Sequence, residues 1–361
     1  PLSNRILHFM LSRFGKSVKS ILLALMFATA FISAFISNVP TCAMFVTIGL
    51  SMLKLYDDEN ERNQTGKAFM IAIPVSAMIG GIMTPVGSSP NLVAIETLKN
   101  ITGYNITFVE WCCYGTPIAL VLIPIAWFVI SKVFPPYELD KDKFKAFIEI
   151  TKVAHAPDKK EIELIVIFLG MIILWIASSW IKSINLFAVA IVGVMIMFMP
   201  GIELLDWKKF TQTTSWDAFF VVPFVISLGT AIGKNNISTI IVDSVFSAGV
   251  NLPVNALVFA LCIFIMLMML ILPNGGAAIT VMAAPVTAMA LQFDINPVIL
   301  ITAMCFCATN CYLLPIESVP LIAYSQGYFK MGEMPKATGV VLLVLALLIT
   351  FWNPLISGIL G

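Results

Sequence analysis

Apolar runs long enough to cross a bilayer recur along this chain, and short polar segments interrupt several of them. A run of about 20 apolar residues is sufficient for a helix to span the hydrocarbon core. Uninterrupted runs predict spans over 112–134, 162–181, 184–200, 216–233 and 337–357. The chain has 361 residues, of which 59% are hydrophobic and 11% charged. The sequence therefore predicts an all-α polytopic membrane protein.

Four further apolar segments are broken near their middle by proline, glycine or asparagine. We expect two re-entrant helical hairpins over 20–53 and 254–291, with tips at SNVPT and PNGG. We also expect two discontinuous helices over 68–95 and 296–324, with breaks at TPVGSSPN and LPIESVP. Irregular backbone at membrane depth is tolerated only where protein or a water-filled cavity surrounds it. The alternative is four proline kinks with packing roles, but breaks in matched pairs exceed what kinks require.

The order of these elements repeats, which divides the chain into two halves. The first repeat covers 1–134 and opens with an amphipathic surface helix over 1–16. Because the chain begins at Pro1 without a start Met, we expect an N-terminal part to precede it. A charged cytoplasmic linker covers 135–161, and the second repeat covers 162–361. The breaks PVGSSP and PIESVP align with their prolines and one serine in register. Paired interrupted segments in two halves of a membrane protein indicate the binding site of a transporter.

The distribution of basic residues orients the chain in the membrane. If both ends of the first hairpin face the cytoplasm, only Lys99, Lys182 and Lys234 of the 21 Lys and Arg residues face outward. This is a strong positive-inside bias. The same threading brings the second hairpin in from outside. We therefore predict inverted repeats whose tips meet near the midplane of a plasma (inner) membrane.

Each helix break offers two kinds of polar group to a ligand. Free carbonyl groups and hydroxyls suit a hard cation such as Na⁺, whereas the N–H groups at helix N-termini suit an anion. One site between the breaks can therefore hold cations together with an anionic substrate.

Three runs of sequence carry a family resemblance. SAFISNVPTCAMF, GGIMTPVGSSPN and CATNCYLLPIESVP resemble the divalent anion:sodium symporter family, whose members carry di- or tricarboxylates or sulfate. The resemblance covers essentially the whole chain but lacks the family's first few transmembrane helices. It implies an elevator movement of the hairpin domain against a dimerising scaffold, with 162–200 contributing to a homodimer. It also implies Na⁺ as the coupling ion, no other cofactor, a small anionic substrate and a lipid bilayer, and no nucleic acid.

The same resemblance assigns residues to two cation sites and one substrate site. The residues assigned to the first Na⁺ site are Ser33, Ser37, Asn38 and Gly87. The second Na⁺ site is assigned Asn274, Glu317 and the backbone near Met269 and Leu272. The residues assigned to the substrate are Asn38, Val39, Thr41, Ser88, Asn274, Gly275 and Ser318.

The chain departs from the family's hairpin-tip motif, which is Ser-Asn-Thr in each repeat. Val39 replaces the threonine of the first tip, although Thr41 follows two residues later, and only Asn274 survives in the second tip. Glu317 stands where the family has a small residue. A carboxylate inside a membrane is expensive and functional by default. It can ligate a cation, titrate as the coupling proton site, or be a neutral structural residue.

Other functions are less well supported by the residues. A proton-coupled anion transporter and an anion exchanger both fit the same breaks, and a sulfate carrier or an anion channel fits them less well. The chain has no phosphate-binding loop and no nucleophile–histidine–acid arrangement, so we do not expect an enzyme. The identity of the anion and the number of coupled ions stay open.

Overall fold

The computed structural model describes residues 5, 8–9, 17–140, 142–143, 156–181, 183–213 and 253–360. Within these ranges the chain forms helices and contains no strand, in agreement with the predicted all-α class. By length and apolar composition, four of the described helices could cross a membrane: Phe108–Val133, Val254–Ile271, Gly275–Gln292 and Met331–Leu360. The predicted surface helix 1–16, the span 216–233 and much of the linker 135–161 lie outside the described residues.

The first half contains a hairpin, a broken helix and a long final helix. These are α2 (Val18–Ser33), α3 (Asn38–Leu53), α4 (Glu59–Gly81), the 3₁₀ turn η1 (Pro85–Gly87), α5 (Ser89–Thr102) and α6 (Phe108–Val133). The broken helix is longer than the predicted 68–95 because its polar ends are also helical. The carboxylate of Asp58 caps α4 by accepting the N–H groups of Asn60 (2.8 Å) and Glu61 (3.0 Å). Gly103, with φ of 75°, ends α5.

The second half contains the remaining helices. They are α8 (Lys159–Ala177), α9 (Leu186–Phe198), α10 (Trp207–Thr213), α13 (Val254–Ile271), α14 (Gly275–Gln292), α15 (Pro297–Thr309), α16 (Ser318–Tyr324), the 3₁₀ turn η3 (Met331–Glu333) and α17 (Met334–Leu360). The break between α15 and α16 covers residues 310–317 and contains no helix. The first break, between α4 and α5, instead includes the turn η1.

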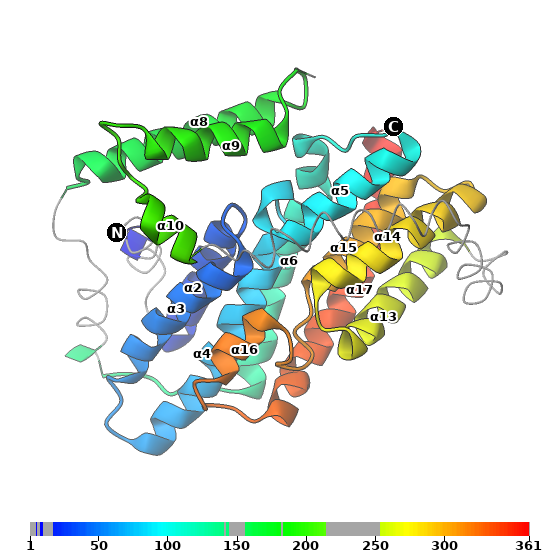
Figure 1. The fold of residues 1–361 in the computed structure, drawn as a ribbon. Helices are drawn as coiled ribbons and strands as arrows, with labels where there is room; N and C mark the ends of the chain where they lie inside the picture. Colours follow the sequence, from blue (N-terminus) through cyan, green and yellow to red (C-terminus); the bar gives the residue numbers. More distant parts are fainter. Residues whose placement is uncertain are drawn as a thin grey trace.

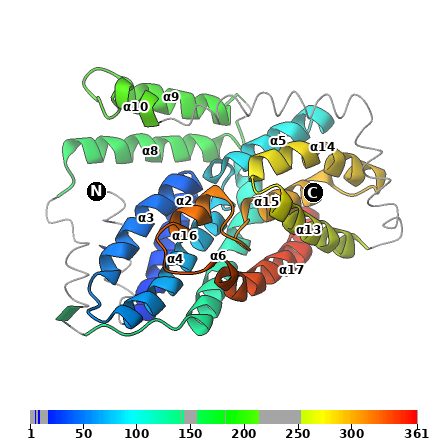
Figure 2. The same ribbon diagram turned by 60° about the horizontal axis from the view of Figure 1, so that its bottom comes forward.

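The contacts between helices fall into two matching sets. The hairpin α2–α3 packs on α4, and the hairpin α13–α14 packs on α15. The half-helix α16 then packs on α3 and α4, and its counterpart α5 packs on α14 and α15. Each broken helix therefore sends its second half onto the hairpin of the other half of the chain. In both views the open ends of the two hairpins lie on opposite sides of the bundle and their tips point toward its middle (Figures 1 and 2).

Helices α8 and α9 pack side by side along one edge of the molecule (Figures 1 and 2). α8 touches the bundle along one stripe of residues spaced by two helical turns. The ring of Phe168 meets that of Phe35 edge-on at 5.8 Å, and Trp175 stacks on Phe108 at 6.1 Å. The opposite face of α8 is apolar and exposed, as shown by Val166 and Ile173, which are 62% and 65% exposed.

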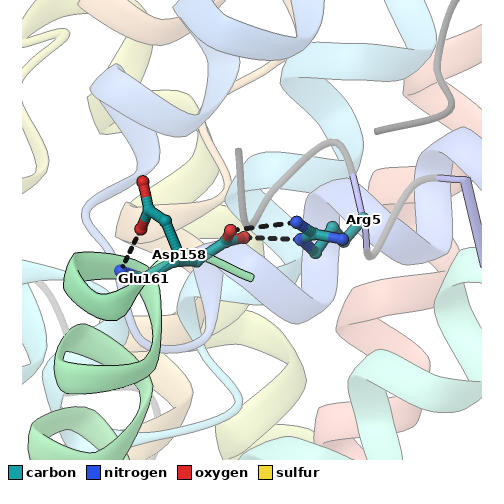
Figure 3. A network of polar contacts seen from close by, with 3 residues as sticks. All are labelled: Arg5, Asp158 and Glu161. Atoms are coloured by element: carbon teal, nitrogen blue, oxygen red, sulfur yellow. Dashed lines mark hydrogen bonds and ion pairs between the residues drawn. The ribbon is translucent and has the colours of Figure 1, made fainter. Parts of the chain in front are cut away.

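An ion pair holds the first turn of α8 (Figure 3). Nε and Nη2 of Arg5 donate to the two carboxylate oxygens of Glu161 at 2.7 and 3.1 Å. Asp158 caps the same turn by accepting the backbone N–H of Glu161 at 2.7 Å. The guanidinium hydrogen bonds hold the pKa of Glu161 below its usual value. This pair ties Arg5, near the N-terminus, to α8.

Candidate functional site

Asn38, at the first hairpin tip, joins the hairpin to both sides of the first break. Its side-chain amide lies 2.8 Å from Ser33 Oγ, 3.1 Å from the carbonyl oxygen of Ala77 and 3.3 Å from that of Gly87. Carbonyl oxygens only accept hydrogen bonds, so the amide nitrogen is the atom that faces them and donates. The residue is buried, with 6% of its surface exposed. Asn38 thus connects α2, α4 and η1 at one point.

The space around Gly87 is lined by backbone carbonyl oxygens. A methyl group placed on Gly87 would lie 2.8 Å from the oxygen of Gly81, 2.9 Å from that of Ala34 and 3.0 Å from that of Ser33. These oxygens come from two segments, the end of α4 and the first tip. Hard cations bind such neutral oxygens. The structure therefore brings together three of the four residues predicted for the first cation site.

The fourth predicted residue, Ser37, is exposed and directly precedes α3. Its side chain makes no capping hydrogen bond. Helix α3 restarts at Asn38 rather than after Thr41, because Pro40 lies in its first turn, where a missing N–H is tolerated. Asn38 and Val39 are therefore the first residues of a helix instead of part of a loop.

Three residues predicted to hold substrate lie near this tip and break. Val39 is 40% exposed and presents an apolar side chain. Thr41 is buried, and its hydroxyl donates to the carbonyl of Ile36 at 3.5 Å. Ser88 is buried and its carbonyl accepts the N–H of Asn91 at 3.1 Å, which starts α5. The Thr41 hydroxyl is therefore directed at the tip's own backbone.

The second tip lies against the end of α15 and the start of α5. A methyl group placed on Gly275 would lie 3.0 Å from the carbonyl oxygen of Ala308 and 3.5 Å from Cγ of Pro90. Asn274 is exposed and caps α14, because its Oδ1 accepts the N–H of Ala277 at 3.0 Å. The second tip therefore touches both halves of the chain.

Glu317 caps the short helix α16. One carboxylate oxygen accepts from Ser318 Oγ at 2.7 Å and the other accepts the N–H of Val319 at 2.8 Å. The carbonyl of Val319 in turn accepts from the thiol of Cys42 on α3 at 3.4 Å. Glu317 therefore has the structural role of a helix cap beside the first hairpin. A carboxylate offers about four acceptor positions, so this cap leaves room for a cation or a proton.

Cation ligands here would be neutral oxygens and one carboxylate, not a cluster of metal-binding side chains. Among the described residues no group of three His, Cys, Asp or Glu side chains is placed to hold a metal ion. A cavity of about 470 Å³ lies elsewhere, between the α5–α6 connection and the α8–α9 connection, and includes Glu96, Lys99 and Asn185 in its lining. None of the predicted site residues lines this cavity.

Sequence reasoning missed three residues that donate side-chain hydrogen bonds to the first break. They are Asn91 on α5 and Trp111 and Thr116 on α6. Asn91 carries a signal in the sequence, since it is an amide directly after Pro90 in the break TPVGSSPN, and the structure buries it fully. Trp111 directly precedes the predicted span 112–134, and its hydrogen bond to the break appears only in the structure.

Comparisons with known proteins agree on one family. The family described as the sodium:sulfate symporter transmembrane region matches residues 1–358. An uncharacterized transporter of Methanocaldococcus jannaschii is 26% identical over 361 residues, which cover 97% of this chain and 77% of that protein. The sodium-dependent dicarboxylate transporter SdcS of Staphylococcus aureus (strain USA300) is 24% identical over 383 residues, which cover 99% of this chain and 71% of that protein.

A third relative, a membrane protein of Cupriavidus necator, is 25% identical over 327 residues. The match covers 88% of this chain and 63% of that protein. The chain thus spans less than two thirds of this relative and about three quarters of the other two.

Proposed function

The chain belongs to the sodium:sulfate symporter family, and on this premise we propose that it is a secondary active transporter that couples Na⁺ to the symport of a small anion. The family is one of symporters, and two of the three relatives named above are described as transporters, so the chain is a transporter and not an enzyme. The observation that carries the proposal is the junction at Asn38, where one buried amide meets the first tip and both sides of the first break.

The first cation site is proposed to form by rotation of the Asn38 amide. In the arrangement described above, the amide nitrogen donates to the carbonyls of Ala77 and Gly87. A half-turn of the amide would place Oδ1 among the carbonyl oxygens near Gly87 instead, and a cation would then replace the lost hydrogen bonds. Ser33 and Ser37 would supply hydroxyl groups to the same site. The second site would use Asn274, Glu317 and the backbone near 269–272.

The anion is proposed to bind between the two tips and the two breaks. Helices α3, α5, α14 and α16 all begin there, and helix N-termini favour negative charge. The proposed contacts are Asn38, Val39, Thr41, Ser88, Asn274, Gly275 and Ser318. The name of the relative SdcS favours a dicarboxylate, and the description of the family favours sulfate, so we propose a di- or tricarboxylate with sulfate as the second candidate.

The proposed mechanism is alternating access by an elevator movement of two inverted repeats. The matched packing of each hairpin with its own broken helix, and of each second half-helix with the other hairpin, supports this arrangement. The bundle that contains both tips would move, and α8 with α9 would belong to the fixed scaffold.

We further propose a homodimer in the plasma membrane, with the exposed apolar face of α8–α9 contributing to its interface. Cross-linking and mass measurement in nanodiscs test this assembly. A monomer in both nanodiscs and mild detergent would contradict it.

Uptake of radiolabelled succinate into proteoliposomes tests the function. We expect accumulation with an inward Na⁺ gradient and none when choline replaces Na⁺ at constant pH. Equal uptake in both buffers would instead identify a proton-coupled transporter or an exchanger. Uptake of sulfate but not succinate would identify the second candidate substrate.

A further inference from the structure

The first break leaves the carbonyl groups at the end of α4 without helical partners, and side chains from two other helices satisfy them. The same side chains reach the carbonyl of Thr84, which also accepts the N–H of Gly87 at 3.3 Å. The end of α4 and the turn η1 cannot continue the helical ladder through this region. Asn91 Nδ2 donates to the carbonyls of Gly81 (2.7 Å) and Thr84 (2.9 Å). Trp111 Nε1 donates to the carbonyl of Ile82 (3.0 Å), and Thr116 Oγ1 donates to the carbonyl of Met83 (2.9 Å). Four consecutive carbonyls therefore have fixed directions. We refer to the three donors as the carbonyl clamp.

The clamp is itself held in place by the second half of the chain. Asn91 is fully buried, and its Oδ1 accepts from the thiol of Cys305 on α15 at 3.3 Å. Trp111 is also fully buried, and its ring meets that of Phe306 edge-on at 5.4 Å. Asn91 and Trp111 therefore cannot reorient without disturbing α15.

The second break has no such clamp. In the part of the chain that the structure describes, no side chain donates to the carbonyls of 311–314. Asn310 Oδ1 and Tyr312 Oη lie within this break and are buried without a hydrogen-bond partner. The clamp is therefore a specific feature of the first break and not a general requirement of an interrupted helix.

The clamped carbonyls lead directly to the oxygens around Gly87. The carbonyl of Gly81 accepts from Asn91 and also faces the space at Gly87. A carbonyl oxygen has two lone pairs, so it can accept this hydrogen bond and still ligate a cation. The hydroxyl of Thr84 donates to the carbonyl of Ala34, which joins the break to the first tip.

We propose that Asn91, Trp111 and Thr116 are positioning residues of the first cation site. They hold the break so that the carbonyls of Gly81 and the first tip converge on Gly87 before a cation arrives. Without them, the peptide planes of 81–84 would be free to turn, and cation binding would have to order them. The inference rests on the proposed Na⁺ coupling.

Matched variants and a binding measurement without transport test the clamp. Thermal unfolding of the purified protein is followed without substrate as Na⁺ replaces choline at constant ionic strength, and the shift gives the half-saturating Na⁺ concentration. We expect Trp111→Phe and Thr116→Val each to raise this concentration by about tenfold, the effect of one lost oriented hydrogen bond. Thr116→Ser keeps the hydroxyl and should have the half-saturating Na⁺ concentration of the wild type.

The controls remove the same kind of bond away from the break. Trp352→Phe removes an indole hydrogen bond to the carbonyl of Cys113 (2.9 Å), and Thr338→Val removes a hydroxyl hydrogen bond to that of Met334 (2.9 Å). We expect the half-saturating Na⁺ concentration of both variants to stay within about twofold of the wild-type value, which is well below the effect of one lost hydrogen bond.

Each outcome has a distinct meaning. If the wild type responds to Na⁺ and the clamp variants behave like the controls, the clamp proposal is overturned and Na⁺ coupling stands. If the wild type shows no Na⁺-specific shift, both proposals fall. If Trp111→Phe does not fold, Thr116→Val and its serine rescue decide the question.

Discussion

Replacing Gly87 with alanine should block the first cation site by filling it with a methyl group. The backbone at Gly87 does not adopt positive φ, so alanine introduces no strain of that kind. The effect comes from steric overlap of the added methyl group with its neighbours. The methyl carbon would lie at or below 3.0 Å from the oxygens of Gly81, Ala34 and Ser33, which is closer than real contacts of a methyl carbon allow.

The size of the effect follows from what must move. All three neighbours are backbone atoms, and the carbonyl of Gly81 is held by Asn91 at 2.7 Å. The break or the tip must therefore shift by several tenths of an ångström. Overpacking of this kind costs about 1–3 kcal/mol. If the same free energy is lost from cation binding, the affinity for Na⁺ falls by about tenfold to a hundredfold, since about 1.4 kcal/mol is a factor of ten.

The assay is the Na⁺ dependence of succinate uptake, combined with thermal unfolding in choline. Gly358→Ala is the control, because a methyl group there meets no atom within 4 Å. We expect Gly87→Ala to need far more Na⁺ for half-maximal uptake, whereas Gly358→Ala behaves as the wild type. A Gly87→Ala protein with wild-type stability and an unchanged Na⁺ requirement would show that these carbonyls do not form the cation site.

Three further predictions concern single side chains. Asn38→Ala and Asn274→Ala should each abolish uptake while the protein stays folded, because each amide lies at a tip; near-normal uptake by both would refute the two-tip site. Glu317→Gln should change the pH profile and the Na⁺ Hill coefficient of uptake together. Glu317→Ala should also lose the α16 cap, which stabilises the helix by about 1 kcal/mol. If Glu317→Gln leaves the pH profile, the Na⁺ dependence and the rate of uptake unchanged, Glu317 has only its structural role. Desolvation opposes the ionised form of Glu333, but the N–H of Lys330 and the ammonium of Lys67 outweigh it and lower the pKa of Glu333. Its stabilising effect is therefore present above about pH 4.3 and is lost as the pH falls through the lower folded value. Glu333→Gln should reduce stability by up to about 1 kcal/mol near pH 7 and by progressively less as the pH falls, as checked by denaturation across this pH range.

Much of the helical architecture could be predicted from the sequence because the membrane restricts the alternatives. Long apolar runs must be helices there, and proline, glycine and asparagine mark where helices stop. The boundaries were less accurate. At the first tip, Pro40 suggested a longer break, but a proline in the first turn of α3 is compatible with the helix. The polar start of α4 carries an Asp58 cap and acidic residues in its first turn, which are helix signals that hydropathy alone does not register.

The candidate site was predictable only as far as local sequence determines it. Ser33, Asn38 and Gly87, which the family resemblance assigns to one cation site, lie together in the structure, and their binding of Na⁺ stays a prediction. The partners of Trp111 and Thr116 could not be inferred, because those contacts join segments with no recognisable spacing between them. The two hydrogen bonds that Glu317 makes to its own helix could not be predicted either, since the sequence does not distinguish a glutamate that caps a helix from one that binds a ligand.

The hydrogen bond between Asn91 and Cys305 has a consequence for biosynthesis. Ribosomes make the chain from its N-terminus, so the first break reaches the membrane well before α14 and α15 exist to cover α5. During that interval the amide of Asn91 lacks its partner thiol, and the face of α5 that α14 and α15 later cover stays open. Completion of the first half therefore has to wait for the second. Separately expressed halves should be degraded when made alone and should accumulate when made together in the same cell.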